Sequence, residues 1–318
     1  PNMHSGYIIT FDKLSQILFF IFLALLFYCL TDNEISKNSK ILKSSICFCL
    51  CIITLVGYIL PFSAAQMNLS ASGVSADKRY YENNDQVSKP ADFKVDSYDL
   101  EFNFRNDLNA VATIKTDDVK DEYRFTLYHG YKISKITDGN NDKLDFTRDS
   151  DYLTIKNTSK SKLIKIYYHG SCDKYYSNYL SVFLPGNFAF YPIPGFNEMY
   201  STHSYAGFDD LSLTYETDFN VTVHSLKKVQ CNLESSTNNE FKGKSDSLTL
   251  LSGFINCVTI NKTQIYYPYF NDAYNSDTIN EKLETFVSKN PNIKKIFIIP
   301  DINLEDIEFV KTFNDYMI

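Results

Sequence analysis

The chain of 318 residues has no tryptophan and only five histidines, and its 31 Lys and Arg are outnumbered by 38 Asp and Glu. The net charge of -7 argues against a nucleic-acid partner, which would need a clustered basic face. No two histidines have the spacing of a helical H-E-x-x-H zinc site, and the sequence has no Gly-rich phosphate loop, Ser-His-Asp order or paired-carboxylate motif. We therefore predict no catalytic residue, no metal ligand and no cofactor within this chain.

Two long runs without charge occupy most of the first 66 residues. Residues 14–30 and 46–65 are each long enough, at 1.5 Å per residue, to cross a hydrocarbon core about 30 Å thick. A signal peptide explains the first run poorly, because Lys13 is the only basic residue before it and a second run follows. The pattern predicts two transmembrane helices within residues 1–66, with the lipid bilayer as a partner.

The distribution of lysines predicts how these helices are oriented. Residues 31–45 carry Lys37, Lys40 and Lys43, whereas Lys13 alone precedes the first run. Because basic residues favour the cytoplasmic side, we expect residues 31–45 to form a cytoplasmic loop. The chain is then a multi-pass cell-membrane protein whose residues after about 66 are extracytoplasmic.

The seven cysteines are divided between the predicted spans and the region after them. The C-x-C-x-C run at Cys47, Cys49 and Cys51 could be a metal site or a set of small packing residues. We favour packing, because alternate residues of a helix do not share a face. One disulfide could form in the outer region, and its pairing cannot be read from the sequence. The three candidates there are Cys172, Cys231 and Cys257.

Residues 67–94 are predicted to form a polar linker that could contain one short helix. Beyond it, the sequence alternates between apolar and polar residues. Alternation together with 24 Tyr and 25 Phe favours strands, and turn residues separate the runs. We predict a mainly antiparallel β sandwich or saddle over 95–262, with Leu100, Phe102 and Phe104 facing inward. The predicted strands are 95–104, 109–115, 123–129, 132–137, 152–156, 163–169, 180–184, 211–216, 220–226, 229–234, 247–251 and 256–260.

The last part of the chain, residues 263–318, has a different pattern. Residues 277–289 have helical spacing, and residues 294–300 form a short apolar run typical of a buried strand. The predicted fold class is thus a membrane helical hairpin, a mainly antiparallel β domain and the start of an α/β segment. We expect the chain to be a fragment of a longer protein.

Two histidines precede glycines at predicted strand ends, in His129-Gly130 and His169-Gly170. They could form a binding pair, but a histidine before a turn glycine is the simpler interpretation and the one we favour.

Three further features carry alternatives. Asp301, Asn303 and Glu305 partly match a calcium loop, but Gly at position six and Glu at position twelve are missing, so acidic helix-start residues are favoured. Residues 184–200, with three prolines and five aromatics, could line a pocket or cover the edge of the core. Four N-x-S/T sequons are expected by chance in an Asn-rich chain. They begin at Asn68, Asn157, Asn220 and Asn261.

A series of short motifs occurs in a recognisable order along the outer region. They are Tyr98-Asp99-Leu100-Glu101-Phe102, Ile164-Lys165-Ile166-Tyr167-Tyr168-His169-Gly170, Phe190-Tyr191-Pro192, Leu213-Thr214-Tyr215-Glu216, Val221-Thr222-Val223 and Leu250-Leu251-Ser252-Gly253-Phe254. This order resembles the N-terminal β domain of the gluzincin aminopeptidases, which include aminopeptidase N and leukotriene A4 hydrolase. Two spans ahead of such a domain look like a bacterial variant fused to the membrane part of an ABC-transporter-type permease. That resemblance implies an ATPase subunit and further membrane helices as partners.

The chain lacks the motifs that carry out the chemistry of this family. The zinc motif is missing, and Asn197-Glu198-Met199 has a different order from the family's G-x-M-E-N substrate loop. The resemblance therefore implies zinc only in the parent protein, in a catalytic domain beyond residue 318.

Three hypotheses for function remain open at this point. The chain is the extracytoplasmic, non-catalytic β domain of a membrane transport protein, or a membrane-anchored zinc aminopeptidase cut before its active site, or a surface binding module. We favour the first hypothesis.

Overall fold

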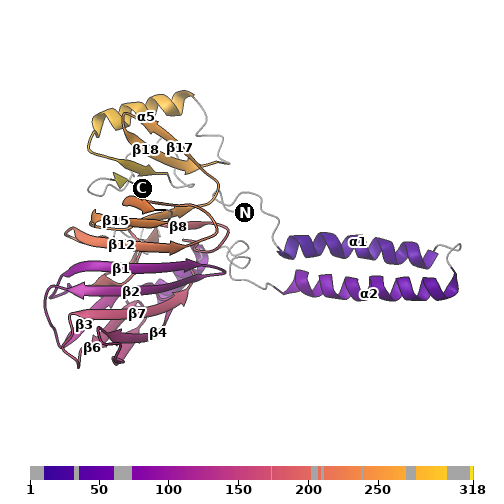
Figure 1. Ribbon diagram of the computed structural model, residues 1–318, viewed down its shortest axis with the longest axis horizontal. Coiled ribbons are helices and arrows are strands. Elements are labelled where there is room, and N and C mark those ends of the chain that lie inside the picture. Colours follow the sequence, from indigo (N-terminus) through magenta and orange to yellow (C-terminus); the bar gives the residue numbers. More distant parts are fainter. Residues whose placement is uncertain are drawn as a thin grey trace. The chain divides into compact units, whose positions relative to one another are not determined.

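The computed structural model describes residues 11–31, 36–60, 74–172, 174–201, 207–208, 211–237, 239–269, 277–298 and 316–317. These residues form two compact units, an N-terminal pair of apolar helices and a mostly antiparallel β domain that continues into an α/β segment (Figure 1). The predicted fold class is confirmed.

The first unit consists of α1 (Phe11–Thr31) and α2 (Lys37–Ile59), both of which are long and apolar enough to cross a membrane. The predicted loop at 31–45 is wrong in length, because α2 already begins at Lys37. Residues 37–45 contain no proline or glycine, and the Lys40 amide donates to the Ser36 carbonyl, so the helix extends past the apolar run. Of the predicted second span, residues 61–65 lie outside the described residues.

Small side chains line the contact between these two helices. Ser15 and Cys29 are buried in α1, and Cys51, Thr54 and Gly57 are buried in α2. At Gly57 the approach is so close that a Cβ atom would lie 2.7 Å from Ser15 Oγ. Contacts between small residues are typical of helix pairs in membranes, where backbones approach closely.

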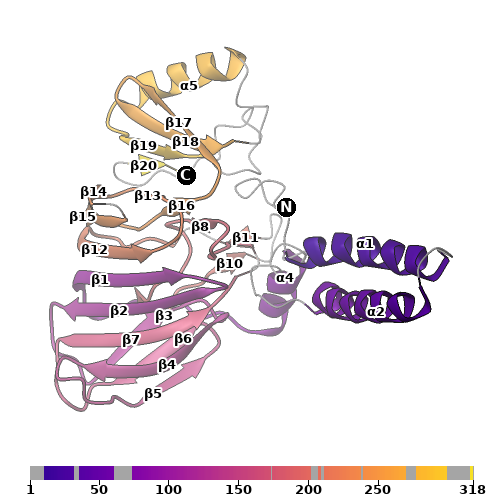
Figure 2. The ribbon, with the colours of Figure 1, turned by 45° about the vertical axis from the view of Figure 1, so that its right-hand side comes forward.

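A seven-stranded sheet forms the main wall of the β domain, in the order β14-β15-β12-β1-β2-β7-β4 (Figure 2). All neighbours are antiparallel except β1 and β12, which run parallel. Leu100, Phe102 and Phe104 are buried on the inner face of β1, as predicted from the alternation. The strands are β1 (Val95–Phe104), β2 (Leu108–Thr116), β4 (Tyr131–Asp138), β7 (Leu163–Gly170), β12 (Thr217–His224), β14 (Glu234–Thr237) and β15 (Glu240–Ser245).

A second sheet, in the order β5-β6-β3-β9, lies behind the first, and one hydrophobic core joins the two (Figure 2). Thr116 Oγ1 of β2 lies 3.1 Å from the Tyr123 hydroxyl of β3, so a buried hydrogen bond also links the layers. Two small sheets, β13-β16-β8 and β10-β11, complete the domain. Their strands and those of the second sheet are β3 (Glu122–Thr126), β5 (Phe146–Asp149), β6 (Tyr152–Lys156), β8 (Val182–Leu184), β9 (Ile193–Pro194), β10 (Tyr200–Ser201), β11 (Gly207–Phe208), β13 (Val229–Cys231) and β16 (Leu250–Ser252).

The segment 184–200 covers the core, which was one of its two predicted roles. Phe190 is fully buried, and its carbonyl accepts a hydrogen bond from the Tyr168 hydroxyl at 2.8 Å. The Tyr98 hydroxyl donates to the Pro192 carbonyl at 2.8 Å. Buried tyrosine hydroxyls therefore satisfy backbone groups that an irregular segment cannot pair in a ladder.

The predicted strand at 211–216 is wrong. Residues 211–216 run without strand pairing, although Leu211 and Leu213 are buried and the Tyr215 hydroxyl accepts a hydrogen bond from the Val95 amide. The apolar alternation here marks side chains that anchor a loop.

Helix α4 (Val74–Asn83) lies within the region predicted as a linker and packs on the β domain. Tyr81 is buried and stacks on Tyr200 with ring centroids 4.8 Å apart. Just beyond the helix, Gln86 Oε1 accepts the amides of Met199 and Tyr200, both at 2.9 Å.

The C-terminal segment contains β17 (Ile255–Ile260), β18 (Thr263–Pro268), α5 (Asp277–Lys289), β19 (Lys295–Phe297) and β20 (Tyr316–Met317). The predicted helix at 277–289 and the strand within 294–300 are present. Strands β18, β19 and β20 pair in parallel, while β17 and β18 form a hairpin around Asn261 and Lys262. The proposed domain boundary at 262 falls in this hairpin. The acidic run at Asp301 lies outside the described residues.

Candidate functional site

A group of titratable and aromatic side chains lies where α4 contacts the β domain. His129 Nδ1 lies 3.2 Å from Asp151 Oδ1, and its Nε2 lies 3.9 Å from Asp77 Oδ1. Tyr80 stacks on the imidazole with ring centroids 3.5 Å apart, and the Tyr128 hydroxyl donates to Asp77 Oδ1 at 2.7 Å. The histidine is therefore held on its edges by carboxylates and on one face by an aromatic ring.

The chemistry of this group suits attachment of α4 better than proton transfer or nucleophilic attack. Cys172 is buried beside Tyr128 and Asp77 and so belongs to the same group. Burial, with a smaller contribution from the charge of Asp77, raises the pKa of its thiol from 9.0 to about 12. The thiol therefore stays protonated at neutral pH, and a protonated, buried thiol is not a nucleophile. Burial also raises the pKa of the Tyr81 and Tyr128 hydroxyls, so both remain hydrogen-bond donors.

The structure gives the two strand-end histidines different surroundings. His129 is enclosed by α4, whereas His169 is exposed on β7, where Asn109 and Lys132 are its cross-strand neighbours. The favoured interpretation as strand-end residues describes His169, near the end of β7, whereas His129 lies in a turn after β3 and contacts α4.

A row of polar side chains crosses the solvent face of the seven-stranded sheet at the carboxyl end of β1. The strand register places Asn103 beside Asn109 and His224, and Asn109 beside His169. A hollow of about 270 Å³ lies over β2 and β7, and another of about 660 Å³ lies beside the ends of β1 and β12. Asn103 lines both hollows.

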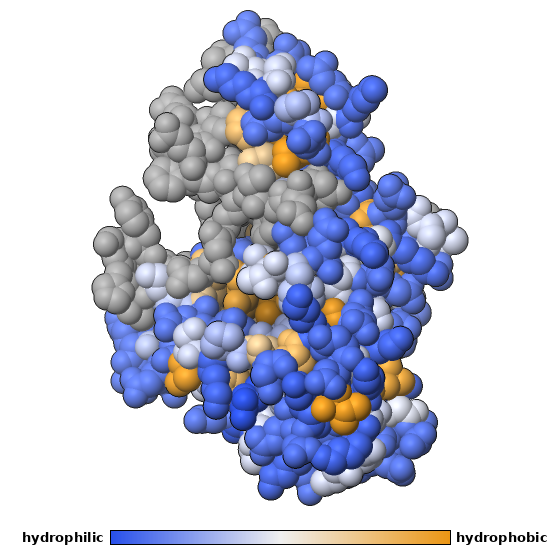
Figure 3. All heavy atoms as spheres, turned by 90° about the vertical axis from the view of Figure 1, so that its left-hand side faces the viewer, coloured by the Kyte–Doolittle hydropathy of each residue, from blue (hydrophilic) through white to orange (hydrophobic). Residues whose placement is uncertain are grey.

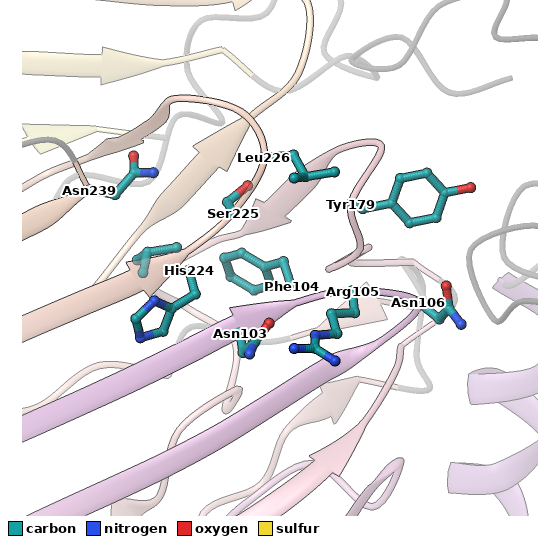
Figure 4. A pocket seen from close by; sticks show the side chains of 10 residues that line it. Asn103, Phe104, Arg105, Asn106, Tyr179, His224, Ser225, Leu226 and Asn239 are labelled. Carbon is teal, nitrogen blue, oxygen red and sulfur yellow. The ribbon is translucent and has the colours of Figure 1, made fainter.

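The larger hollow combines apolar and polar side chains from three parts of the chain. Figure 4 shows Leu226 and Tyr179 on one side of Phe104, with Arg105 and Asn103 on the other. Phe104 is buried and Leu226 is 86% exposed, so the hollow has an apolar floor and an apolar side chain in solvent.

Backbone and side-chain hydrogen bonds fix the frame of this hollow. The Tyr179 amide donates to the Arg105 carbonyl at 2.6 Å, which joins the loop after β1 to the segment before β8. Asn239 Oδ1 accepts the Val229 amide at 2.9 Å. His224 Nε2 lies 3.1 Å from Glu101 Oε1, so this imidazole is paired with a carboxylate on the neighbouring strand.

Sequence reasoning did not identify the residues of this hollow. Arg105 and His224 are more than a hundred residues apart in the sequence, and they meet because β1 and β12 are parallel neighbours whose carboxyl ends reach the same edge. The alternation of apolar and polar residues within one strand does not indicate which other strand that strand will pair with.

The cysteines and sequons have plain structural roles or none. Cys172, Cys231 and Cys257 are free, so the disulfide that the sequence allowed is not formed. In α2, Cys51 is buried and Cys49 is exposed, which confirms that the C-x-C-x-C run has no common face.

The side chain of Asn157, which begins one of the sequons, is hydrogen-bonded to backbone groups close to it in the fold. Asn157 is buried, its amide group donates to the carbonyls of Lys120 and Ser161, and its Oδ1 accepts the Ser161 amide. Asn261 lies exposed in the β17–β18 turn and Asn220 is half-buried in β12, while Asn68 lies outside the described residues.

Comparisons with known proteins give similarity at the level of solved structures alone. No family model matches the chain, and no curated protein matches it. The chain is similar to an M1 zinc metallopeptidase from Deinococcus radiodurans, with 10% identity, a TM-score of 0.43 and coverage of 68% of this chain and 58% of that one. It is also similar to yeast LTA4 hydrolase in complex with bestatin, with 15% identity, a TM-score of 0.44 and coverage of 75% and 41%.

The chain thus spans 58% and 41% of the length of these two proteins. Likeness at these identities and TM-scores assigns no family or activity to this chain.

A zinc ion, for which the Deinococcus metallopeptidase is named, does not fit the part of this chain that the structure describes. No three His, Cys, Asp or Glu side chains gather there in an arrangement that could hold a metal. A catalytic zinc site needs three protein ligands beside an open position, so we derive no chemical step through zinc.

Proposed function

We propose that this protein is a membrane-anchored protein whose α1–α2 hairpin spans the bilayer and whose β domain is an extracytoplasmic, non-catalytic binding domain. The observation that supports it best is the exposure of apolar side chains on the hairpin. All but four of the exposed large apolar side chains of the described chain lie within residues 11–60, among them Phe27 at 60% and Ile53 at 65%.

The size of this apolar surface supports lipid over water as the surroundings of the two helices. Burying one Leu, Ile or Phe side chain contributes roughly 1.5–3 kcal/mol. Leaving the surface of both helices in water would therefore cost tens of kcal/mol. The β domain differs, since Figure 3 shows a face that is mainly hydrophilic with isolated apolar residues. Its four exposed large apolar side chains are Val87, Leu226, Phe254 and Tyr269.

The lysines of α2 support the proposed orientation. Lys37, Lys40 and Lys43 lie in the first two turns of α2, at the end that the hairpin turn precedes. Basic residues at a helix end favour the cytoplasmic side, so the opposite end of α2 and the chain after it are extracytoplasmic.

Cysteine labelling of intact cells with a membrane-impermeant maleimide tests this orientation. In a Cys257→Ser background we expect Asn261→Cys to be labelled and Asn38→Cys to stay protected until the cells are opened. Asn261 and Asn38 are both exposed, so burial in the protein does not explain a difference between them. If Asn38→Cys alone were labelled, the topology would be the reverse of the proposed one. Equal labelling of both variants would contradict the membrane span.

For the parent protein we propose an ABC-type permease, with an ATPase subunit and further membrane helices as partners. The two apolar helices ahead of a β domain support this proposal. A membrane-anchored zinc aminopeptidase is the alternative, and the complete gene separates the two. Four or more spans upstream are expected for the permease, whereas H-E-x-x-H downstream would establish the peptidase.

A further inference from the structure

Four polar side chains in the larger hollow carry hydrogen-bond donors that the described residues do not occupy. They are those of Asn103, Arg105, Asn106 and Tyr179, which form no side-chain hydrogen bond or ion pair within the described chain. A guanidinium group, two amides and a phenol therefore line one hollow.

The two carboxylates nearest to these donors in the sequence are hydrogen-bonded to neighbouring side chains, one of which, His224, also lines the hollow. Glu101 pairs with His224, and Asp107 Oδ1 accepts the Asn109 side-chain amide at 3.1 Å. The lining of the hollow contains no Asp or Glu. Arg105 is thus the one Lys, Arg, Asp or Glu side chain among the residues that line the hollow.

From this arrangement we infer that the hollow binds an organic anion, in which a carboxylate or phosphate group is joined to an apolar portion. The inference rests on the proposed binding role of the β domain and specifies its ligand class. Arg105 supplies the paired N–H donors that suit a carboxylate or phosphate. Leu226, exposed at 86%, supplies the apolar contact, and a volume of about 660 Å³ suits a small molecule or the end of a larger one.

The test measures binding of small probes to the full chain in lipid nanodiscs by calorimetry, with empty nanodiscs as reference. The probes are N-acetyl-leucine, the uncharged N-acetyl-leucinamide and 3-methylbutyl phosphate. We expect at least one anion to bind and the amide to bind at least about tenfold more weakly, since a charged hydrogen bond is lost. The better of the two anions then identifies the carboxylate or the phosphate as the natural group.

Two variants assign the binding to this hollow. Arg105→Gln should weaken the better anion at least about tenfold, whereas Lys115→Gln, which removes an exposed cation of β2 outside the hollow, should leave it unchanged. Leu226→Ser should weaken the same anion several-fold, and it supplies an independent result should the arginine variant fold poorly.

Equal binding of the acid and the amide, the same loss in Lys115→Gln as in Arg105→Gln, or no binding by any probe would overturn the inference. The labelling experiment on Asn38 and Asn261 does not involve the hollow, so failure of the ligand class and failure of the proposed topology are distinguishable.

Discussion

Tyr81 provides a direct test of how α4 is attached to the β domain. Its ring is 5% exposed, stacks on Tyr200 at 4.8 Å and meets the rings of His129 and Phe208 edge-on at 5.5 and 6.3 Å. Truncation of a buried aromatic side chain costs about 3–5 kcal/mol, because apolar burial is lost and a cavity remains. We expect Tyr81→Ala to lower the free energy of unfolding by that amount.

Two matched variants separate the ring from its hydroxyl and from the helix surface. The Tyr81 hydroxyl lies 3.5 Å from His129 Nδ1, at the limit of a hydrogen bond, so Tyr81→Phe should cost less than about 1 kcal/mol. Lys78 forms an exposed ion pair with Glu82 one turn along α4, and Lys78→Ala should cost at most about 0.5 kcal/mol.

Urea unfolding of the full chain in nanodiscs, followed by tyrosine fluorescence, gives the free energies. Amide exchange of α4 shows whether the helix is released locally. A loss below about 1 kcal/mol in Tyr81→Ala, with α4 still protected from exchange, would refute the reasoning that ring packing holds this helix.

Three further outcomes are expected. Asn157→Ala should destabilise the protein by about 2–4 kcal/mol in the same unfolding assay, because the buried Asn157 side chain loses three hydrogen bonds to partly buried backbone groups, and Asn140→Ala, in an exposed turn at ordinary φ, should change little. Stability should fall as pH rises from about 9 towards 12, because the buried Cys172 thiol, whose pKa is raised from 9.0 to about 12, keeps its proton in the folded state while the unfolded chain loses it. Pulse proteolysis across this range should show a shallower decline in Cys172→Ala. Gly57→Leu should separate α1 from α2 and reduce oxidative cross-linking of Cys29 in α1 to Cys47, its neighbour in α2, and an unchanged yield would contradict the described helix contact.

Local patterns predicted those parts of the fold in which one segment determines its own environment. The inward Leu100, Phe102 and Phe104 and the helix at 277–289 follow from periodicity, because burial on one face is a property of the segment itself. The strand at 211–216 failed for the same reason, since apolar side chains that anchor a loop at Leu211 and Leu213 alternate like those of a strand.

The candidate hollow could not be predicted, because it depends on pairings between distant segments. Arg105 follows a strand that was predicted correctly, and nothing around it distinguishes it from an ordinary turn residue. Its significance comes from the parallel neighbour β12, which brings Leu226 to the same edge, and from Tyr179, whose backbone fixes the loop. His129 is similar, since α4 and its carboxylate Asp77 lie far from it in the sequence.

The C-terminal strand shows that the α/β segment and the β domain share a core. Tyr316 of β20 is fully buried in the same hydrophobic cluster as the strands of the β domain, and its hydroxyl lies 2.6 Å from Ser247 Oγ. At Gly186 a Cβ atom would clash with that hydroxyl, so this position accepts no side chain while Tyr316 is in place. A fragment that ends at residue 262 would lack the ring that fills this site and would expose Gly186 and Ser247. The folding unit that carries the hollow therefore extends at least to Tyr316, and binding experiments require the whole segment.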